Sequence, residues 1–225
     1  VVTASLGNSV YWYEITKGEQ KERVEWRKQI YCDDKIVFES TNYLENVSHV
    51  MLCHPNLETQ SWKFYNNSEN IEYSVTREGD SLIYSGVMEG EPVEKIVLAE
   101  NLPWYQIHGI SFPQLLEKGF DKEKFISIRP EDGKLFTLIA ERKHVEAVHV
   151  NGVSVDAIRV EVRLAGLLGS LGKVNYWFRE SDFVFVKYEG ITGFPGKDAV
   201  VYQLQEYMPA TEQAAVPVKS LPLDF

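Results

Sequence analysis

The chain has 225 residues, of which 44% are hydrophobic and 12% aromatic, enough to build one sizeable core and to exclude disorder except at the ends. Its formal net charge is −10, from 33 acidic and 23 basic residues. Such a field repels phosphate and anionic lipid surfaces, so we expect no nucleic-acid partner and a ligand that is neutral, apolar or cationic.

The N-terminal residues carry no targeting signal. The chain begins at Val1, without an initiating Met and without a basic-then-apolar leader. We therefore expect the numbering to start inside a longer precursor from which a leader has been removed. No apolar run approaches the roughly 18 residues of a membrane-spanning helix, so no transmembrane segment is expected.

Alternation of apolar and polar residues with a period of two predicts β-strands along most of the chain. In the segment 22–32, apolar side chains alternate with charged or polar ones, which predicts a strand with one buried face and one face exposed to solvent. The segments 69–78 and 81–88 repeat this pattern on either side of Gly79-Asp80, and so they are expected to form a hairpin. The sequence predicts about fourteen strands, the others including 9–16, 35–41, 48–53, 60–65, 93–98, 124–129, 135–142, 173–178, 183–189 and 199–207.

A second hairpin is predicted near the middle of the C-terminal half. The segments 144–150 and 153–164 flank Asn151-Gly152, a dipeptide suited to a two-residue turn with positive φ at both positions. The apolar phase changes within 153–164, which predicts a bulge near Ala157.

Helix is scarce in the predicted structure. One short helix is expected at 114–118, because Pro113 precedes it and Gly119 follows it. It is expected to sit over one end of the sheet. Beyond the last strand the composition shifts to Ala, Pro, Glu and Lys, so we expect one β-rich domain at 1–207 and an extended tail at 208–225.

Successive hairpins with one dry face must curl or stack to bury that face. The predicted fold class is therefore all-β with a minor α component: a curved, mostly antiparallel sheet that forms a half-barrel or open barrel, with one short helix. A sandwich and a closed barrel remain the alternatives.

The sequence contains no pattern typical of a metal or catalytic site. Its histidines lack the close spacing of zinc ligands, and the segment 109–113 lacks the second glycine of a nucleophile elbow. Ser111 is expected instead to cap the short helix. We therefore expect no catalytic residue, no metal, no cofactor and no enzymatic activity. Cys32 and Cys53 permit either one disulfide or two buried thiols.

The segment 164–172 is unusual because it joins two predicted strands with four leucines and three glycines, whereas connections exposed to water are usually polar. It is expected either to fold over the open end of the core or to form a flexible hydrophobic lip that admits an apolar ligand or meets a partner. The aromatic residues exceed the needs of a small sandwich, so a subset is expected to line a cavity. The residues expected to bind a ligand are Leu164, Leu167, Leu168, Leu171, Trp26, Trp62, Tyr176 and Phe178.

The run 176–190 consists of an aromatic strand, a short acidic turn and an apolar strand ending in Lys-Tyr-Glu-Gly. With its flanks, roughly 145–207, it resembles the C-terminal half of a family of bacterial extracytoplasmic β-proteins classed as a domain of unknown function. That family is similar in plan to the periplasmic lipoprotein-carrier superfamily, in which a curved antiparallel sheet forms an unclosed barrel with an apolar interior. The resemblance implies export to the periplasm or another extracytoplasmic compartment, and a hydrophobic ligand or an envelope partner; it carries over no catalytic residue.

Together these features predict a non-enzymatic exported protein that binds a lipid or acyl chain within its curved sheet, with the segment 164–172 near the opening. The alternative is a structural or assembly module of the cell envelope that binds a protein partner through its apolar loop and a sheet edge. A fully packed interior would favour the alternative.

Overall fold

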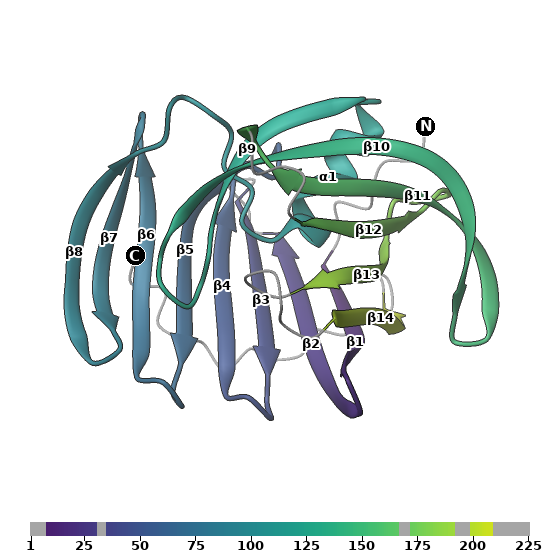
Figure 1. Ribbon diagram of the computed structural model, residues 1–225, viewed down its shortest axis with the longest axis horizontal. Coiled ribbons are helices and arrows are strands. Elements are labelled where there is room, and N and C mark those ends of the chain that lie inside the picture. The colour runs from purple at the N-terminus through teal and green to yellow at the C-terminus, as the bar shows by residue number, and fades with distance from the viewer. Residues whose placement is uncertain (1–7, 31–34, 167–171, 192–198, 209–225) are drawn as a thin grey trace.

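The computed structural model describes residues 8–30, 35–166, 172–191 and 199–208, and most of them belong to one antiparallel sheet of 14 strands (Figure 1). One helix, α1 (His108–Glu117), follows the eighth strand. The strands are β1 (Ser9–Lys17), β2 (Gln20–Ile30), β3 (Ile36–Asn42), β4 (Val47–Cys53), β5 (Thr59–Asn66), β6 (Ile71–Glu78), β7 (Ser81–Met88), β8 (Glu91–Leu98), β9 (Lys122–Ile128), β10 (Leu135–Val150), β11 (Val153–Leu164), β12 (Lys173–Arg179), β13 (Phe185–Ile191) and β14 (Ala199–Met208).

The sheet consists of two meanders that meet at its middle. Strands β1 to β8 pair in sequence order, strands β9 to β14 do the same, and β1 pairs with β14, where Val10 lies opposite Met208. Strands β8 and β9 are therefore the two edges, and the sheet is not closed into a barrel. This confirms the predicted all-β fold with an open, curved antiparallel sheet.

Bulges at four strand pairs bend the sheet. In the β10–β11 ladder the register shifts between Arg142 and Val145, so the extra residue lies in β10. The prediction of a bulge near Ala157, in β11, is therefore wrong as to the strand, because the bulge lies in β10. In Figure 1, β10 and β11 arch over α1 and their hairpin curls down at the far end.

The two predicted hairpin turns are confirmed. Asn151 and Gly152 have φ values of 51° and 75°, as a two-residue turn of this hand requires. Gly79, with a φ of 57°, and Asp80 connect β6 to β7.

Helix α1 begins earlier than predicted. It starts at His108, and Pro113 lies inside it instead of preceding it. The predicted C-terminal end is correct, because Gly119 adopts a φ of 73° and its N–H donates to the carbonyl of Leu116 at 3.0 Å. Ser111, expected to cap the helix, is instead fully buried within it.

Apolar packing accounts for the early start of α1. The ring of Phe112 is fully buried, with its centroid 5.5 Å from that of Phe125 and 5.7 Å from that of Tyr176. Ile110, in the first turn of the helix, is also buried. Burial of these side chains outweighs the hydrogen bond that Pro113 cannot make, so the helix extends on both sides of the proline. Helix α1 thus contributes Ile110, Phe112, Leu115 and Leu116 to the core on the concave side of the sheet.

The segment 99–107 runs from β8 to α1 and covers part of the β9 edge. Trp104 is fully buried and forms an isolated parallel bridge with Ile126 of β9. Its carbonyl also accepts a hydrogen bond from the N–H of Thr59 at 2.8 Å. Since Thr59 belongs to β5, this segment ties the two meanders together across the interior.

The C-terminal residues and one of the two cysteines lie outside the described part of the chain. The division between a domain at 1–207 and a tail stays a prediction, because 209–225 lie outside the described residues. Cys53 is a free, buried thiol, and Cys32 falls outside the described part of the chain. No described helix has both the length and the apolar character needed to cross a membrane.

Candidate functional site

A pocket of about 270 Å³ opens between α1 and the part of the sheet formed by β1, β2, β13 and β14. Its lining is mainly apolar and aromatic, which is typical of ligand sites. The lining residues are Tyr11, Tyr13, Lys28, Ile36, Pro55, Leu57, Gly109, Ile110, Pro113, Gln114, Glu117, Asp182, Phe183, Val184, Phe185 and Tyr207.

The inner wall of the pocket is a rigid aromatic cluster. The rings of Trp26 and Phe185 stack with centroids 5.5 Å apart, and Tyr13 lies 4.5 Å from Trp26. The hydroxyl of Tyr13 donates to the backbone carbonyl of Phe185 at 3.0 Å, which fixes its ring. Gly109 lets α1 approach this wall, because a Cβ there would lie 2.8 Å from Phe185 Cδ1 and 2.9 Å from Trp26 Cζ3.

Two bulky side chains at the pocket are held in an unfavourable backbone conformation. Leu57 and Phe183 have φ values of 59° and 56°, which cost a residue with a Cβ roughly 1–2 kcal/mol. The other described non-glycine residues with positive φ are Asn or Glu, so these two are the bulky apolar exceptions, and both line this pocket. Strain retained at one surface supports a functional role for that surface.

A few polar groups accompany the apolar lining. Lys28 shares the concave face of β2 with Trp26, and burial lowers the pKa of its ammonium to about 8. Asp182 accepts two hydrogen bonds from Arg179, at 2.8 and 2.6 Å, so its charge is compensated within the turn. Gln114 donates to the carbonyl of Pro55 at 3.1 Å, while its own Oε1 is buried with no partner in the described part of the chain.

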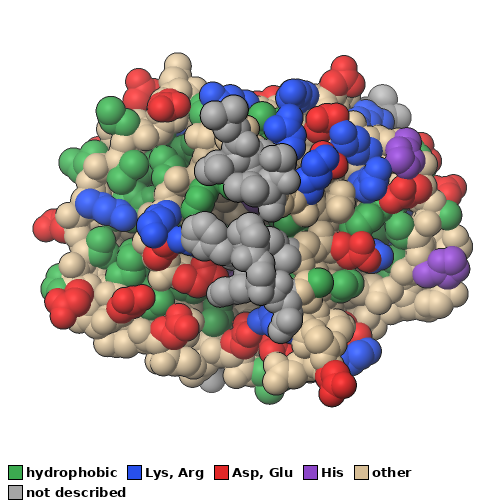
Figure 2. All heavy atoms as spheres, viewed as in Figure 1, with side chains coloured by type: hydrophobic (Ala, Val, Ile, Leu, Met, Phe, Trp, Pro, Cys, Tyr) green, Lys and Arg blue, Asp and Glu red, His purple; other side chains and the backbone are tan. Residues whose placement is uncertain are grey.

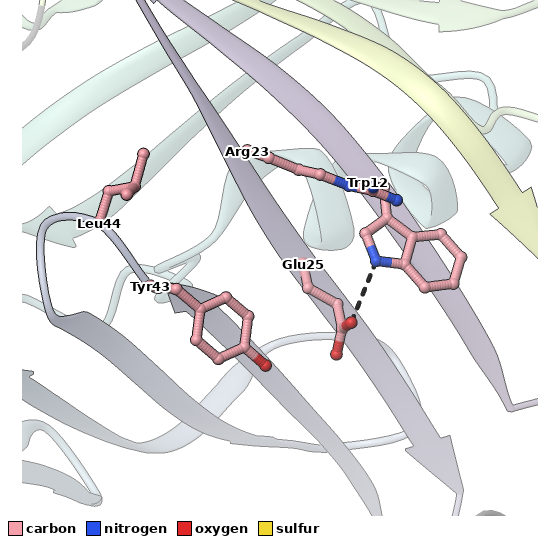
Figure 3. Close-up of a pocket in the computed structure, with 5 residues that line it drawn as sticks. All are labelled: Trp12, Arg23, Glu25, Tyr43 and Leu44. Atoms are coloured by element: carbon pink, nitrogen blue, oxygen red, sulfur yellow. Dashed lines mark hydrogen bonds between the residues drawn. The ribbon is translucent and has the colours of Figure 1, made fainter.

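A second hollow, of about 330 Å³, lies on the convex face between β1, β2 and the turn after β3 (Figure 3). The carboxylate of Glu25 accepts a hydrogen bond from the Trp12 indole at 3.0 Å, between that ring and the ring of Tyr43. Tyr43 and Leu44 are 69% and 73% exposed, so two of its walls are exposed turn side chains. The pocket beside α1 is the better candidate, since its walls continue into the core.

The interior holds two histidines in neutral surroundings. The ring of His49 stacks on Trp62, and its Nδ1 accepts a hydrogen bond from the indole N–H at 3.3 Å. His108 Nδ1 lies 2.9 Å from the hydroxyl of Tyr176, and its Nε2 is buried without a partner among the described residues. Burial lowers the pKa of each imidazole to about 4.

Among the described residues, the basic side chains of β10 to β12 are accompanied by acidic ones. Figure 2 shows Lys and Arg side chains gathered at the upper right, where Figure 1 places β10 to β12, with carboxylates among them. The ion pairs of these strands include Lys173 with Glu161 at 3.1 Å and Arg159 with Glu146 at 3.9 Å. Because the cations are interleaved with acids, this region is a solvated ion-pair network. Among the residues that the structure describes, no cluster of His, Cys, Asp or Glu could hold a metal ion.

Four of the predicted ligand residues can be placed in the core. Trp26, Tyr176 and Phe178 surround Phe185, with ring centroids 5.5, 5.9 and 5.7 Å from it, directly behind the pocket. Trp62 is fully buried in a separate cluster with His49, beyond this group.

The leucine-rich segment is only partly described. Leu164 ends β11 and is half-buried, whereas Leu167, Leu168 and Leu171 lie outside the described residues. Their expected role in ligand binding stays a prediction.

Sequence reasoning missed most of the pocket lining. Lys28 interrupts the apolar face of β2, and a lysine on the buried face of a strand is a sequence signal for a polar group at a site. Leu57 lies in a turn and Ile110 in the unpredicted first half of α1, so neither belongs to a period-two pattern of apolar residues.

No protein-family description matches the sequence, and no curated protein matches it. The fold is similar to that of a solved β-barrel-like protein of the domain of unknown function DUF1849 from Brucella abortus, with a TM-score of 0.62 and 7% identity over 91% of this chain and 98% of that chain. At that identity the likeness shows the fold alone.

The weaker likenesses include two proteins whose descriptions name lipoproteins. The hypothetical lipoprotein YmcC from Escherichia coli has a TM-score of 0.41 and 12% identity over 92% of this chain and 90% of that chain. A putative outer membrane lipoprotein-sorting protein domain from Vibrio parahaemolyticus has a TM-score of 0.36 and 9% identity over 92% of this chain and 87% of that chain. The predicted resemblance to a family of β-proteins classed as a domain of unknown function is confirmed as a likeness of fold by the Brucella abortus protein.

Proposed function

We propose that the protein is a non-enzymatic binding protein that holds one apolar chain, such as the acyl chain of a lipid, in the pocket between α1 and the concave face of the sheet. The observation that supports this most directly is the lining, in which Leu57 and Phe183 keep unfavourable backbone conformations beside an aromatic wall. The sequence resemblance supports a location in the bacterial periplasm or another extracytoplasmic compartment.

The size of the pocket sets the size of the ligand. Its volume of about 270 Å³ lies just below the roughly 300–1,000 Å³ typical of small-molecule sites, so it suits a single short chain rather than a two-chain lipid. The remaining concave space is filled by α1 and aromatic side chains, and a larger ligand would have to displace them.

Uptake of a fluorescent fatty acid by the delipidated protein tests this proposal. We expect saturable binding that Ile110→Phe weakens about tenfold, or ~1.4 kcal/mol, because Ile110 lines the pocket and a larger side chain occupies it. Ile96→Phe is the matched control, since Ile96 is 71% exposed on β8. Absence of saturable uptake, or equal loss in both variants, would refute the proposal.

The alternative, a module that binds a protein partner, has one specific observation in its favour. Strand β8 pairs only with β7 in the described sheet, and its Ile96 and Leu98 side chains are 71% and 72% exposed. Such an edge can accept a further strand from another chain. Under this alternative, Ile96→Lys would abolish capture of an envelope protein and leave fatty-acid uptake unchanged.

A further inference from the structure

We infer that the hollow on the convex face of the sheet is a docking site for a basic protein partner, which inserts the cationic side chain of an Arg or Lys between Trp12 and Tyr43. This site lies on the opposite face from the pocket beside α1 and does not depend on the binding of an apolar chain. The formal net charge of −10 of the whole chain also favours a basic partner.

The alternation of side chains along β1 divides its aromatic residues between the two faces of the sheet. Tyr11 and Tyr13 line the pocket beside α1, so Trp12, which lies between them in the sequence, points to the convex face. Glu25 lies directly opposite Trp12 in the β1–β2 ladder, and its carboxylate accepts the indole N–H at 3.0 Å. Figure 3 shows this carboxylate between the rings of Trp12 and Tyr43. A side chain that enters the hollow thus meets two aromatic rings and a carboxylate.

The turn that carries Tyr43 and Leu44 is held in place by Asn42. The side-chain oxygen of Asn42 accepts the backbone N–H groups of Leu44 at 3.1 Å and of Glu45 at 3.2 Å, and its Nδ2 donates to Glu22 at 2.8 Å. Tyr43 and Leu44 are therefore large apolar side chains that an ordered turn keeps in water. Exposed apolar side chains close to Trp and Arg are typical of the residues that dominate the binding energy of protein interfaces.

The charges around the hollow favour a cation over an anion. Arg27 forms an ion pair with Glu25 and lies opposite Glu39 in the β2–β3 ladder. Burial raises the pKa of Glu39, Arg27 opposes this rise, and the charge of Glu25 adds to it, so the two carboxylates are close enough to repel each other. The cation at the rim, Arg23, is already paired with Glu206 at 3.7 Å. Three carboxylates therefore face two guanidinium groups, and an incoming cation balances the excess.

The Trp12 ring already attracts a cation. The guanidinium carbon of Arg23 lies 5.4 Å from the ring centroid, within the roughly 6 Å range of a cation–π contact. Trp is the strongest aromatic partner for a cation, and Tyr43 offers a second ring across the hollow. An Arg or Lys side chain also brings methylene groups that pack on Leu44 while its charged end reaches Glu25. The exposed walls suit such a side chain, because the surface of the partner itself excludes water around it.

The indole N–H resonance of Trp12 in a proton–nitrogen NMR spectrum reports on this site, because that N–H donates to Glu25. Trp12→Phe identifies the resonance by its loss. The protein is titrated with acetylated and amidated Ala-Arg-Ala and Ala-Lys-Ala, with Ala-Glu-Ala as the matched peptide of opposite charge and guanidinium chloride as the free cation. We expect the Arg and Lys peptides to move the resonance saturably, with dissociation constants on the order of 1 mM for a single side chain, and Ala-Glu-Ala to leave it in place.

Two variants test the ring and the carboxylate separately. Tyr43→Ala and Glu25→Gln should each weaken binding of Ala-Arg-Ala by about two- to fivefold, whereas Tyr43→Phe keeps the ring and should retain binding. Leu98→Ala is the matched control, because Leu98 is as exposed as Leu44 but lies on β8. Since Tyr43 is exposed, Tyr43→Ala should fold normally, and it decides the test if Glu25→Gln lowers stability.

The outcomes separate this inference from the proposed function. A Trp12 resonance that neither cationic peptide moves, or that Ala-Glu-Ala moves equally, overturns the inference, and so does unchanged binding in Tyr43→Ala. Equal affinity for guanidinium chloride and Ala-Arg-Ala overturns the assignment to a protein side chain, because the methylene groups and the peptide backbone then contribute nothing. Preference for the Arg or the Lys peptide supports the inference in either case and identifies the cation. Fatty-acid uptake by Tyr43→Ala should equal that of the unmodified protein, so failure of one proposal leaves the other standing.

Discussion

Acidification from pH 7 to pH 5 should destabilise the fold through His49 and His108. Both imidazoles have a pKa of about 4 in the folded protein, against 6.5 for an ordinary histidine, because burial disfavours their charged forms. The neutral form of His49 is also required by its contact, since Nδ1 accepts the indole N–H of Trp62 and a protonated ring has no lone pair there. Their contribution to stability is therefore complete above pH 6.5 and is lost as the pH falls toward 4.

The magnitude follows from proton linkage. At pH 5 an unfolded-state histidine is almost fully protonated while each folded-state ring is mostly neutral, which lowers the free energy of unfolding by about 2 kcal/mol per histidine. Two such residues give about 4 kcal/mol, a large part of the roughly 5–15 kcal/mol of an ordinary domain. Hydrogen bonds hold the pKa values of Asp132 and Glu146 below the usual range. Their contribution to the free energy of unfolding is therefore lost only at lower pH.

Urea unfolding followed by tryptophan fluorescence at pH 7, 6 and 5 measures this loss. His108→Phe keeps the stacking on Phe112 but cannot be protonated, so it should remove about half of the pH-dependent change. His54→Gln is the control, because His54 is exposed. If the midpoint is the same at pH 7 and 5, or if His108→Phe leaves the pH dependence intact, the explanation by buried neutral rings is wrong.

Three further substitutions test the pocket and the core. Gly109→Ala should destabilise the protein by about 1–3 kcal/mol in urea unfolding, because its Cβ would lie 2.8 Å from Phe185; an unchanged midpoint would mean that α1 shifts freely. Leu57→Gly should weaken fatty-acid uptake and change stability by less than about 1 kcal/mol, because relief of the positive φ is offset by loss of a half-buried side chain. Glu89→Gly, at a φ of 52° and exposed, should raise stability by about 1 kcal/mol and leave uptake unchanged. Unaltered uptake in Leu57→Gly would remove that side chain from the site. Trp62→Ala should cost about 3–5 kcal/mol, since the side chain is fully buried, and a calorimetric loss below 1 kcal/mol would contradict its place in the core.

Period-two alternation predicts most of the strands because they have one face in the core and one in water, whereas the edge strand β8 has no buried residue. It separated 135–142 from 144–150, although both belong to β10, because the register shift between Arg142 and Val145 interrupts the alternation without ending the strand. A bulge and a strand end look alike in one strand, and only the partner strand distinguishes them.

The site was harder to predict than the fold. The aromatic residues chosen from the sequence, such as Trp26 and Phe178, do form the wall behind the pocket, because large apolar side chains on a strand's dry face are buried together. The pocket itself depends on where α1 rests against that wall. That position is set by Gly109, whose missing side chain gives no signal in a hydrophobic pattern.

The pairing of β1 with β14 has a consequence for how the chain reaches its native state. Val10 finds its partner Met208 only after almost the whole chain has been synthesised, which at roughly 10 residues per second takes about 20 s. Until then β1 presents a free edge on a half-formed sheet, and so many distant contacts make folding slow. We expect nascent chains that end before β14 to bind hydrophobic dyes and holding chaperones, and chains that include β14 to lose both.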